Sequence, residues 1–348
     1  MIKISLSEIQ QRELINSKNL EYERYYKTVT LTLGIKYHLD STIYDCNFIS
    51  AEPRLKLIDE ENEINPDFIL QYDDNKKGIL GEIKTTIPIN EDYVLNNEFK
   101  QIEKYCKKVT GWNTITKNVE SHDVLCFIYL TDSDRLVNLF KKFLSEDKVN
   151  IICNVCISEF STVTSLKIGE GDVLLLKHKY GTLGCKTLTE KLMENIKIRI
   201  DELQEKYEVC KFTRKEPPIE YMMDHLWMQI FPVYAEREKS KEQDITVGIN
   251  ELLETIHTFY VSWTGLTDEH SQVRETWIKK SLEKFIEIEL AEEIEDKPGH
   301  YKIFYGKQIP HNFRKYLIEK CSSHELEKIG RKTRKISKEQ TTLIETNS

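Results

Sequence analysis

An α/β domain followed by a smaller, mainly helical domain is what the sequence predicts. Between residues 18 and 157, segments with helical periodicity alternate with short apolar segments typical of buried strands. Between residues 220 and 322, three amphipathic segments are followed by two short strand-like segments around an Asp-Lys-Pro-Gly turn. The length of 348 residues also corresponds to about two domains.

The first domain is expected to follow the order α-β-β-β-α-β-α-β. Its opening helix, residues 18–39, carries apolar and aromatic side chains at helical spacing. The strand segments are short and apolar, and the turn at 73–78 contains Asp, Asn and Gly, which favour turns. The elements expected after the first helix are strands 43–50, 66–72 and 78–86, helix 91–108, strand 123–131, helix 136–144 and strand 149–157.

The rest of the chain sets the expected boundaries. Short strands are expected at 162–168 and 172–179, and one long helix at 187–210. The adjacent prolines Pro217 and Pro218 give the strongest boundary signal. Three helices followed by a hairpin is the order of a winged helix. We expect a catalytic-type α/β domain at 1–186, a connector helix and linker at 187–219, a winged-helix-like domain at 220–322 and a polar, basic, disordered tail at 323–348.

Composition excludes several classes of protein. A hydrophobic fraction of 39% is too high for a disordered chain. No apolar stretch approaches the ~20 residues that span a bilayer, and the N-terminus lacks a signal-peptide pattern, so a cytoplasmic protein without membrane contact is expected. The eight cysteines are expected to be reduced, buried thiols, and Cys153-Asn-Val-Cys156 has no second Cys or His pair at zinc-site spacing.

Two carboxylates and one ammonium are expected to meet on one face of the sheet. Asp67 opens one strand, and Glu82 and Lys84 lie in the next, where alternation puts both on the same face. Antiparallel pairing across the short turn brings Asp67 beside them. Hard oxygen ligands suit Mg²⁺, and a Lys beside the metal can orient or deprotonate a water for attack on phosphorus. The alternative is a solvated ion pair on two surface strands.

These residues, with Pro66, resemble the motif of the PD-(D/E)xK, or restriction-endonuclease-like, nuclease superfamily. The resemblance covers residues 18–157 and implies an α-β-β-β-α-β core with a mixed central sheet. It implies that Asp67, Glu82 and the Ile83 backbone carbonyl bind Mg²⁺ or Mn²⁺ and that Lys84 assists the attacking water. Gln101 and Tyr105 are similar to a Gln-x-x-x-Tyr pattern of RecB-like exonucleases, with Gln101 in a catalytic and Tyr105 in a nucleic-acid-binding role. Family members also often place a Glu on the first helix, where Glu23 is preferred to Glu21.

The C-terminal half supplies candidate contacts to a polyanion. Arg274, Lys279 and Lys280 lie beside Trp277 in the candidate recognition helix, although an acidic segment follows it. The stretch 311–338, which includes Arg331 and Lys332, holds nine Lys and Arg against three acidic residues. The chain as a whole is acidic, with a net charge of -8, which argues against a general nucleic-acid binder unless local patches decide the contacts.

The sequence thus predicts a metal-dependent nuclease that hydrolyses phosphodiester bonds of DNA, of a restriction or defence type. The alternatives are a non-catalytic DNA- or protein-binding module on the same scaffold and a ribonuclease that uses the same site. The winged-helix-like domain would contact DNA, a second copy of the chain or a partner protein, and these three remain open.

Overall fold

The computed structural model describes most of the chain as two compact units. The described residues are 6–42, 45–51, 53–58, 63–110, 112, 119–145, 151, 153–164, 171–206, 212, 215–237, 244–259, 274–305 and 312–345. Unit 1 comprises Met1–Tyr25, Glu216–Phe259 and Val273–Ser348, and unit 2 comprises Tyr26–Lys215 and Tyr260–Gln272. Helix α1 (Leu6–Thr42) contributes to both units.

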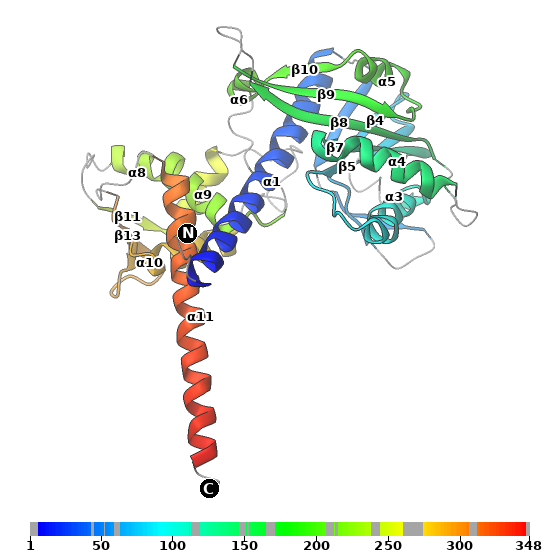
Figure 1. Cartoon of the computed structure of the whole chain (residues 1–348). Coiled ribbons are helices and arrows are strands. Elements are labelled where there is room, and N and C mark those ends of the chain that lie inside the picture. The colour runs from blue at the N-terminus through cyan, green and yellow to red at the C-terminus, as the bar shows by residue number, and fades with distance from the viewer. Residues whose placement is uncertain are drawn as a thin grey trace. The chain divides into compact units, whose positions relative to one another are not determined.

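Unit 2 is built on a mixed seven-stranded sheet with the order β1-β4-β5-β7-β8-β9-β10 (Figure 1). The contacts β5·β7 and β7·β8 are parallel, and the other neighbours are antiparallel. The α/β class and the mixed sheet predicted from the sequence are confirmed. The strands of this sheet are β1 (Cys46–Ala51), β4 (Phe68–Tyr72), β5 (Lys77–Lys84), β7 (Ser121–Tyr129), β8 (Val155–Thr164), β9 (Asp172–Tyr180) and β10 (Ile196–Arg199). A second, small sheet contains β2 (Leu55–Leu57), β3 (Glu63–Ile64) and β6 (Val109–Thr110).

Helices cover both faces of the large sheet. On one face, α3 (Phe99–Tyr105) and α4 (Ser133–Leu144) bury an aromatic cluster, in which the Phe99 ring lies 5.2 Å from that of Phe140. The central strands supply Val124, Cys126 and Ile128 to the same core. The opposite face meets α1, where Gly34 has no side chain and allows Leu174 and Ile198 to approach closely. Because both faces are covered, residues 123–128 of β7 are all buried, and all of them except Asp123 are apolar.

The β4–β5 hairpin sets the register of the candidate site. Its turn residues Asp73, Asp74 and Asn75 all have positive φ, a conformation that Asp and Asn tolerate better than most residues. Phe68 pairs with Gly81, and a side chain at position 81 would collide with the Phe68 ring. Gly81 therefore allows the Phe68 ring to cross β5 at this point, and the residue before Phe68 then lies beside the residue after Gly81.

The expected long helix at 187–210 is wrong. The segment forms helix α5 (Lys186–Met193), strand β10 and helix α6 (Ile200–Lys206). The alternating Ile196 and Ile198 are buried while Lys197 is exposed, which is the pattern of a strand. Asn195 adopts a positive φ and ends the turn after α5. Residues 187–206 therefore belong to the large sheet and its flanking helices.

Unit 1 is mainly helical and holds a three-stranded antiparallel sheet with the order β11-β13-β12. Its core is aromatic: the Trp227 ring contacts those of Phe231, Phe285 and Phe313. The remaining elements are α7 (Ile219–His225), the π-helical turn η4 (Leu226–Ile230), α8 (Phe231–Arg237), β11 (Ile245–Gly248), α9 (Ile249–Phe259), α10 (Glu275–Glu287), β12 (Ala291–Glu293), β13 (His300–Ile303) and α11 (Phe313–Glu345).

Unit 1 confirms the hairpin expected around the Asp-Lys-Pro-Gly turn and corrects two other expectations. Residues 245–248, expected to be helical, form strand β11, because the β-branched Ile245, Thr246 and Val247 pair with β13. Part of the tail at 323–348, expected to be disordered, continues helix α11 as far as Glu345. No helix in the described part of the chain is both long and apolar enough to cross a membrane.

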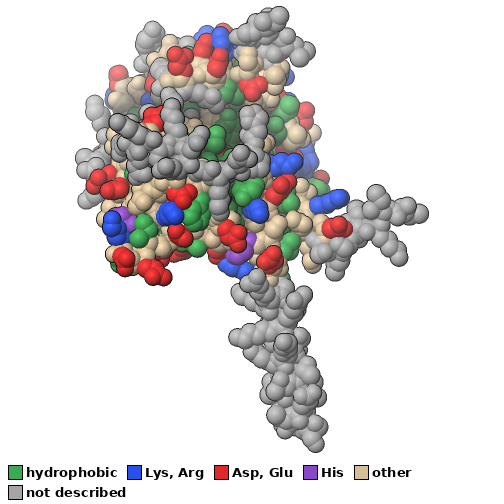
Figure 2. All heavy atoms as spheres, turned by 90° about the vertical axis from the view of Figure 1, so that its left-hand side faces the viewer, with side chains coloured by type: hydrophobic (Ala, Val, Ile, Leu, Met, Phe, Trp, Pro, Cys, Tyr) green, Lys and Arg blue, Asp and Glu red, His purple; other side chains and the backbone are tan. Residues whose placement is uncertain are grey.

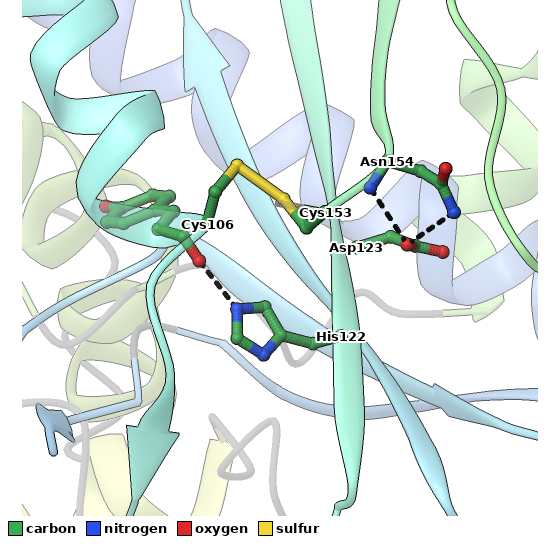
Figure 3. The surroundings of a disulfide bond; sticks show 6 residues. Cys106, His122, Asp123, Cys153 and Asn154 are labelled. Carbon is green, nitrogen blue, oxygen red and sulfur yellow. Dashed lines mark hydrogen bonds between the residues drawn. A yellow bond between two sulfur atoms is a disulfide. The ribbon is translucent and has the colours of Figure 1, made fainter. Parts of the chain in front are cut away.

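Two cysteines form a disulfide, which corrects the expectation of reduced thiols. Cys106 follows α3, and Cys153 precedes β8 (Figure 3). His122 Nε2 lies 2.6 Å from the Tyr105 carbonyl oxygen, which is a second contact at the C-terminal end of α3. The pair is 47 residues apart in sequence, so spacing alone did not indicate it. Five other cysteines are buried thiols, as expected: Cys46, Cys126, Cys156, Cys185 and Cys321. Cys210 lies outside the described residues.

Candidate active site

Asp67, Glu82 and Lys84 meet on the face of the sheet that α3 covers. Glu82 and Lys84 pair with Cys126 and Ile128 of β7, whose side chains lie in the core on that face. Lys84 Nζ lies 2.9 Å from Glu82 Oε1. Asp67 and Glu82 are only 4% and 6% exposed, so the alternative of a solvated surface ion pair is wrong. The three groups form a buried polar cluster, and such clusters need complete hydrogen bonding.

Asp67 is held by a backbone group of the neighbouring strand. Its Oδ2 accepts a hydrogen bond from the Ile83 N–H at 2.7 Å, and its own N–H donates to the Gly81 carbonyl at 2.8 Å. The N–H and C=O of one strand residue point to the same side, so the Ile83 carbonyl also points toward Asp67. Lys215 Nζ lies 2.7 Å from the other carboxylate oxygen, Oδ1.

Lys84 donates to three acceptors. These are Glu82 Oε1 at 2.9 Å, Glu98 Oε2 at 2.7 Å and Gln101 Oε1 at 2.8 Å. Burial by itself would lower the pKa of Lys84, but the negative charge of Glu82 and the hydrogen bonds to Glu82 and Glu98 outweigh it, and the pKa is raised. Lys84 is therefore a charged ammonium at neutral pH. It is suited to orient a water or to stabilise negative charge, and it is not suited to remove a proton.

Glu82 carries an elevated pKa. Burial is the largest cause, the negative charge of Asp67 adds to it, and the charge of Lys84 and hydrogen bonds from Lys84 and Tyr105 oppose it; the result is a pKa of about 7. A cation bound between the two carboxylates would offset the repulsion from Asp67 that helps to raise the pKa of Glu82. A bound divalent ion would therefore lower the pKa of Glu82.

Helix α3 places an amide and a phenol against Glu82. Gln101 Nε2 donates to Glu82 Oε1 at 3.1 Å and to the Tyr105 hydroxyl oxygen at 2.9 Å, and Tyr105 in turn donates to Glu82 Oε2 at 2.9 Å. Gln101 thus faces the cluster and not solvent. Tyr105 is only 2% exposed, which leaves its ring little surface for the nucleic-acid-binding role that the resemblance implies. Its hydroxyl positions Glu82.

The donor set fits a hard divalent cation. In the described residues no group of three or more His, Cys, Asp and Glu side chains is arranged to hold a metal ion. The set here is smaller: two buried carboxylates with the Ile83 carbonyl on the same side. All three donors are oxygens, the ligand type of Mg²⁺ and Mn²⁺, and Mg²⁺ usually keeps several waters beside one or two carboxylates.

Sequence reasoning missed Glu98 and Lys215. Glu98 ends the π-helical turn η1 (Val94–Glu98), which follows α2 (Glu91–Tyr93) and leads into α3. Its spacing from Gln101 and Tyr105, three and seven residues, is the signal that could have found it. Lys215 lies 148 residues after Asp67 in the predicted linker, and no local pattern indicates their contact.

The expected Glu on the first helix has a partner within unit 1. Glu23 Oε1 accepts from Arg314 Nη2 at 2.7 Å, and both residues belong to unit 1, whereas Asp67 and Glu82 belong to unit 2. Glu21 is exposed in the same part of α1. A metal-binding role for Glu23 or Glu21 stays a prediction.

The predicted nucleic-acid contacts of unit 1 lie at the N-cap of α10, on α10 and on α11. Arg274 and Lys279 are exposed, and the Arg274 guanidinium stacks 5.9 Å from the Trp277 ring. Lys280 Nζ is paired with Glu216 at 2.6 Å. The side chains of Arg331 and Lys332 lie outside the described residues, although the backbone there is helical. Among the side chains that are coloured in Figure 2, basic and acidic groups are interspersed across the visible face.

Comparisons with known proteins give one distant structural likeness. No protein-family model matches the chain, and no curated protein sequence matches it. Among solved structures, SfsA from Pyrococcus furiosus in complex with Ca²⁺ is similar at 10% sequence identity and a TM-score of 0.20. The alignment covers 48% of this chain and 64% of that chain. At this TM-score the likeness carries no weight for function.

Proposed function

We propose that this protein is a metal-dependent nuclease that hydrolyses phosphodiester bonds of DNA. The observation that carries the proposal is the meeting of Asp67, Glu82 and Lys84 on one buried face of β4 and β5, with Gln101 from α3 joining Glu82 to Lys84. Burying polar groups in a sheet core costs free energy unless they are paired. A purely structural role therefore explains this cluster less well than a functional one. The order α1-β1-β4-β5-α3-β7 in and around the large sheet is similar to the α-β-β-β-α-β order of the PD-(D/E)xK core, which supports the proposal.

In this proposal each residue has a separate task. Asp67, Glu82 and the Ile83 carbonyl hold Mg²⁺ or Mn²⁺, which supplies Lewis-acid stabilisation of the phosphoryl oxygens. Lys84, charged and fixed by three acceptors, stabilises the negative charge that develops on the phosphate. Gln101 and Tyr105 hold Glu82 and Lys84 in place, so little reorganisation is needed during the reaction. Glu98 forms a second ion pair with Lys84, in addition to that with Glu82, and helps to hold the ammonium in place.

Unit 1 is proposed to bind the DNA backbone. The order α8-β11-α9-α10-β12-β13 and the three-stranded sheet are similar to those of a winged helix, which supports this part of the proposal. In this arrangement α10 is the candidate recognition helix, and its exposed Arg274 and Lys279 are suited to contact phosphates. The acidic residues that follow α10 favour a contact limited to the helix. Protein binding by the same surface is the competing outcome.

The proposal is tested with the full chain and a matched pair of variants. Wild type, Lys84→Ala and the control Lys191→Ala are incubated with linear, circular and single-stranded DNA and with structured RNA, in Mg²⁺, in Mn²⁺ or in chelator. Lys191 is a suitable control because it also pairs with a carboxylate, Glu194 at 2.7 Å, at a surface site in unit 2. Product lengths over time separate cuts within the chain from cuts at its ends.

We expect wild type and Lys191→Ala to cleave DNA only with metal, and Lys84→Ala to be at least about a hundredfold slower. Binding of DNA without cleavage by wild type would support the non-catalytic module. Cleavage of RNA but not DNA would support the ribonuclease. Undiminished cleavage by Lys84→Ala would show that the activity arises at another site.

A further inference from the structure

A second ammonium reaches the site from a distant part of the chain. Lys215 lies between α6 and α7 and is the last residue of the first segment of unit 2, Tyr26–Lys215. Its Nζ lies 2.7 Å from Asp67 Oδ1, and its side chain is 59% exposed while that of Asp67 is 5% exposed. The Lys215 ammonium therefore stands at the solvent side of a buried carboxylate. Unlike Lys84, it comes from a loop and can withdraw into water.

The contact falls on the oxygen that a metal needs. Asp67 Oδ2 accepts from the backbone N–H of Ile83, which the strand pairing holds in place, whereas Oδ1 accepts from the exposed side chain of Lys215, so Oδ1 is the oxygen that can more easily exchange its partner for a cation. Divalent cations bind carboxylate oxygens at about 2.0–2.6 Å, closer than the ammonium. An ammonium and a divalent cation on the same oxygen lie within a few ångströms and repel each other strongly at a partly buried site. The two cations therefore compete for Asp67.

We infer that Lys215 is a counter-ion of Asp67 that competes with the metal for this carboxylate. This inference rests on the proposed function and adds its regulation. Without metal, Lys215 neutralises Asp67 and lowers the repulsion between Asp67 and Glu82. When metal binds, Lys215 leaves Oδ1, which its flexible four-carbon stem and exposed position permit. The positive charge at position 215 therefore lowers the metal affinity of the protein.

Metal binding in the absence of nucleic acid tests the inference directly. Mn²⁺ binding to the full-length protein is measured by calorimetry and by the electron paramagnetic resonance signal of free Mn²⁺. The variants are Lys215→Met, which removes the charge and keeps the stem, and Lys215→Arg, which keeps the charge. Lys191→Met is the matched control, because it removes an exposed lysine from an ion pair of the same 2.7 Å length. Asp67→Asn reports whether the measured binding uses Asp67.

Lys215→Met is expected to bind Mn²⁺ about three- to tenfold more tightly than wild type, the range that corresponds to the loss of one partly exposed ion pair. Lys215→Arg and Lys191→Met are expected to stay within about twofold of wild type. Equal or weaker binding by Lys215→Met, with wild-type binding that Asp67→Asn abolishes, would overturn this inference and leave the proposed function intact. No binding that depends on Asp67 would overturn both. Thermal unfolding of each variant confirms that it is folded.

Discussion

Tyr105, the last residue of α3, donates a hydrogen bond from its hydroxyl to Oε2 of Glu82 in β5, at 2.9 Å. Tyr105→Phe removes this donor and leaves a buried carboxylate oxygen without a partner. We expect the free energy of unfolding to fall by about 1–3 kcal/mol. Urea denaturation measures it, and Tyr93→Phe is the control because Tyr93 is 50% exposed. Equal effects of the two substitutions would contradict the assigned contact.

The elevated pKa of Glu82 makes stability depend on pH. The folded protein holds this proton up to about pH 7, above the ordinary value of 4.5, so the stabilisation is fully present below the ordinary pKa and is lost as pH rises through the folded pKa. Glu82→Gln is neutral at every pH. The metal-free variant should therefore be more stable than wild type at pH 8, by roughly 2 kcal/mol, with a gain that shrinks toward pH 5.

Chemical denaturation of both proteins at pH 5, 6, 7 and 8 in chelator checks this dependence. Glu190→Gln, an exposed substitution on α5, is the control and is expected to give a small difference that does not vary with pH. A gain for Glu82→Gln that grows toward pH 5 would have the wrong sign and would contradict the buried, proton-holding state of Glu82.

The disulfide between Cys106 and Cys153 is predicted to stabilise unit 2. The two residues are 47 apart in sequence, and a loop of that length corresponds to about 4 kcal/mol in the chain-entropy treatment. Reduction should therefore lower the thermal midpoint of wild type. The double variant Cys106→Ala/Cys153→Ala should show the lower midpoint already and should not respond to reductant. Alkylation and mass spectrometry of the oxidised protein should leave these two cysteines unmodified.

The sequence predicted much of the site because its signals are local. Strand alternation put Glu82 and Lys84 on one face, and the Asp-Asn turn between two short strands placed Asp67 beside them. Helical spacing placed Gln101 and Tyr105 together, but it could not show that Tyr105 is buried, since burial depends on how α3 packs against the sheet, where the Tyr105 hydroxyl meets Glu82. The contact of Lys215 with Asp67 joins residues 148 positions apart, and no periodicity encodes the path of the chain between them.

The difference between local signals and tertiary contacts also explains the errors in the predicted fold. The sequence predicts helix across β10 because only Ile196 and Ile198 alternate there, between two segments with helical periodicity. Strand β11 is only four residues long, and its pairing with β13 is a tertiary contact between segments more than fifty residues apart. Short strands of this kind are decided by the partner strand and not by their own sequence.

The proposed DNA contact of α10 is predicted to follow counter-ion release. Lys279→Ala should weaken DNA binding at low salt and reduce the slope of log K against log salt by about one. The expected loss is similar for different DNA sequences, because a phosphate contact does not read bases. Fluorescence anisotropy at several salt concentrations measures both quantities, with Lys191→Ala as control. An unchanged slope would favour protein as the partner of α10.

The most direct test of the proposed nuclease is the initial rate of cleavage of linear double-stranded DNA as Mg²⁺ is titrated, for wild type, Asp67→Asn and Asp73→Asn. Asp73 is a suitable control because it is an exposed carboxylate in the hairpin turn, with a positive φ that Asn also tolerates. Wild type and Asp73→Asn should cleave with a saturating dependence on Mg²⁺, and Asp67→Asn should be at least about a hundredfold slower. No metal-dependent cleavage by wild type, or equal rates for wild type and Asp67→Asn, would contradict the proposal.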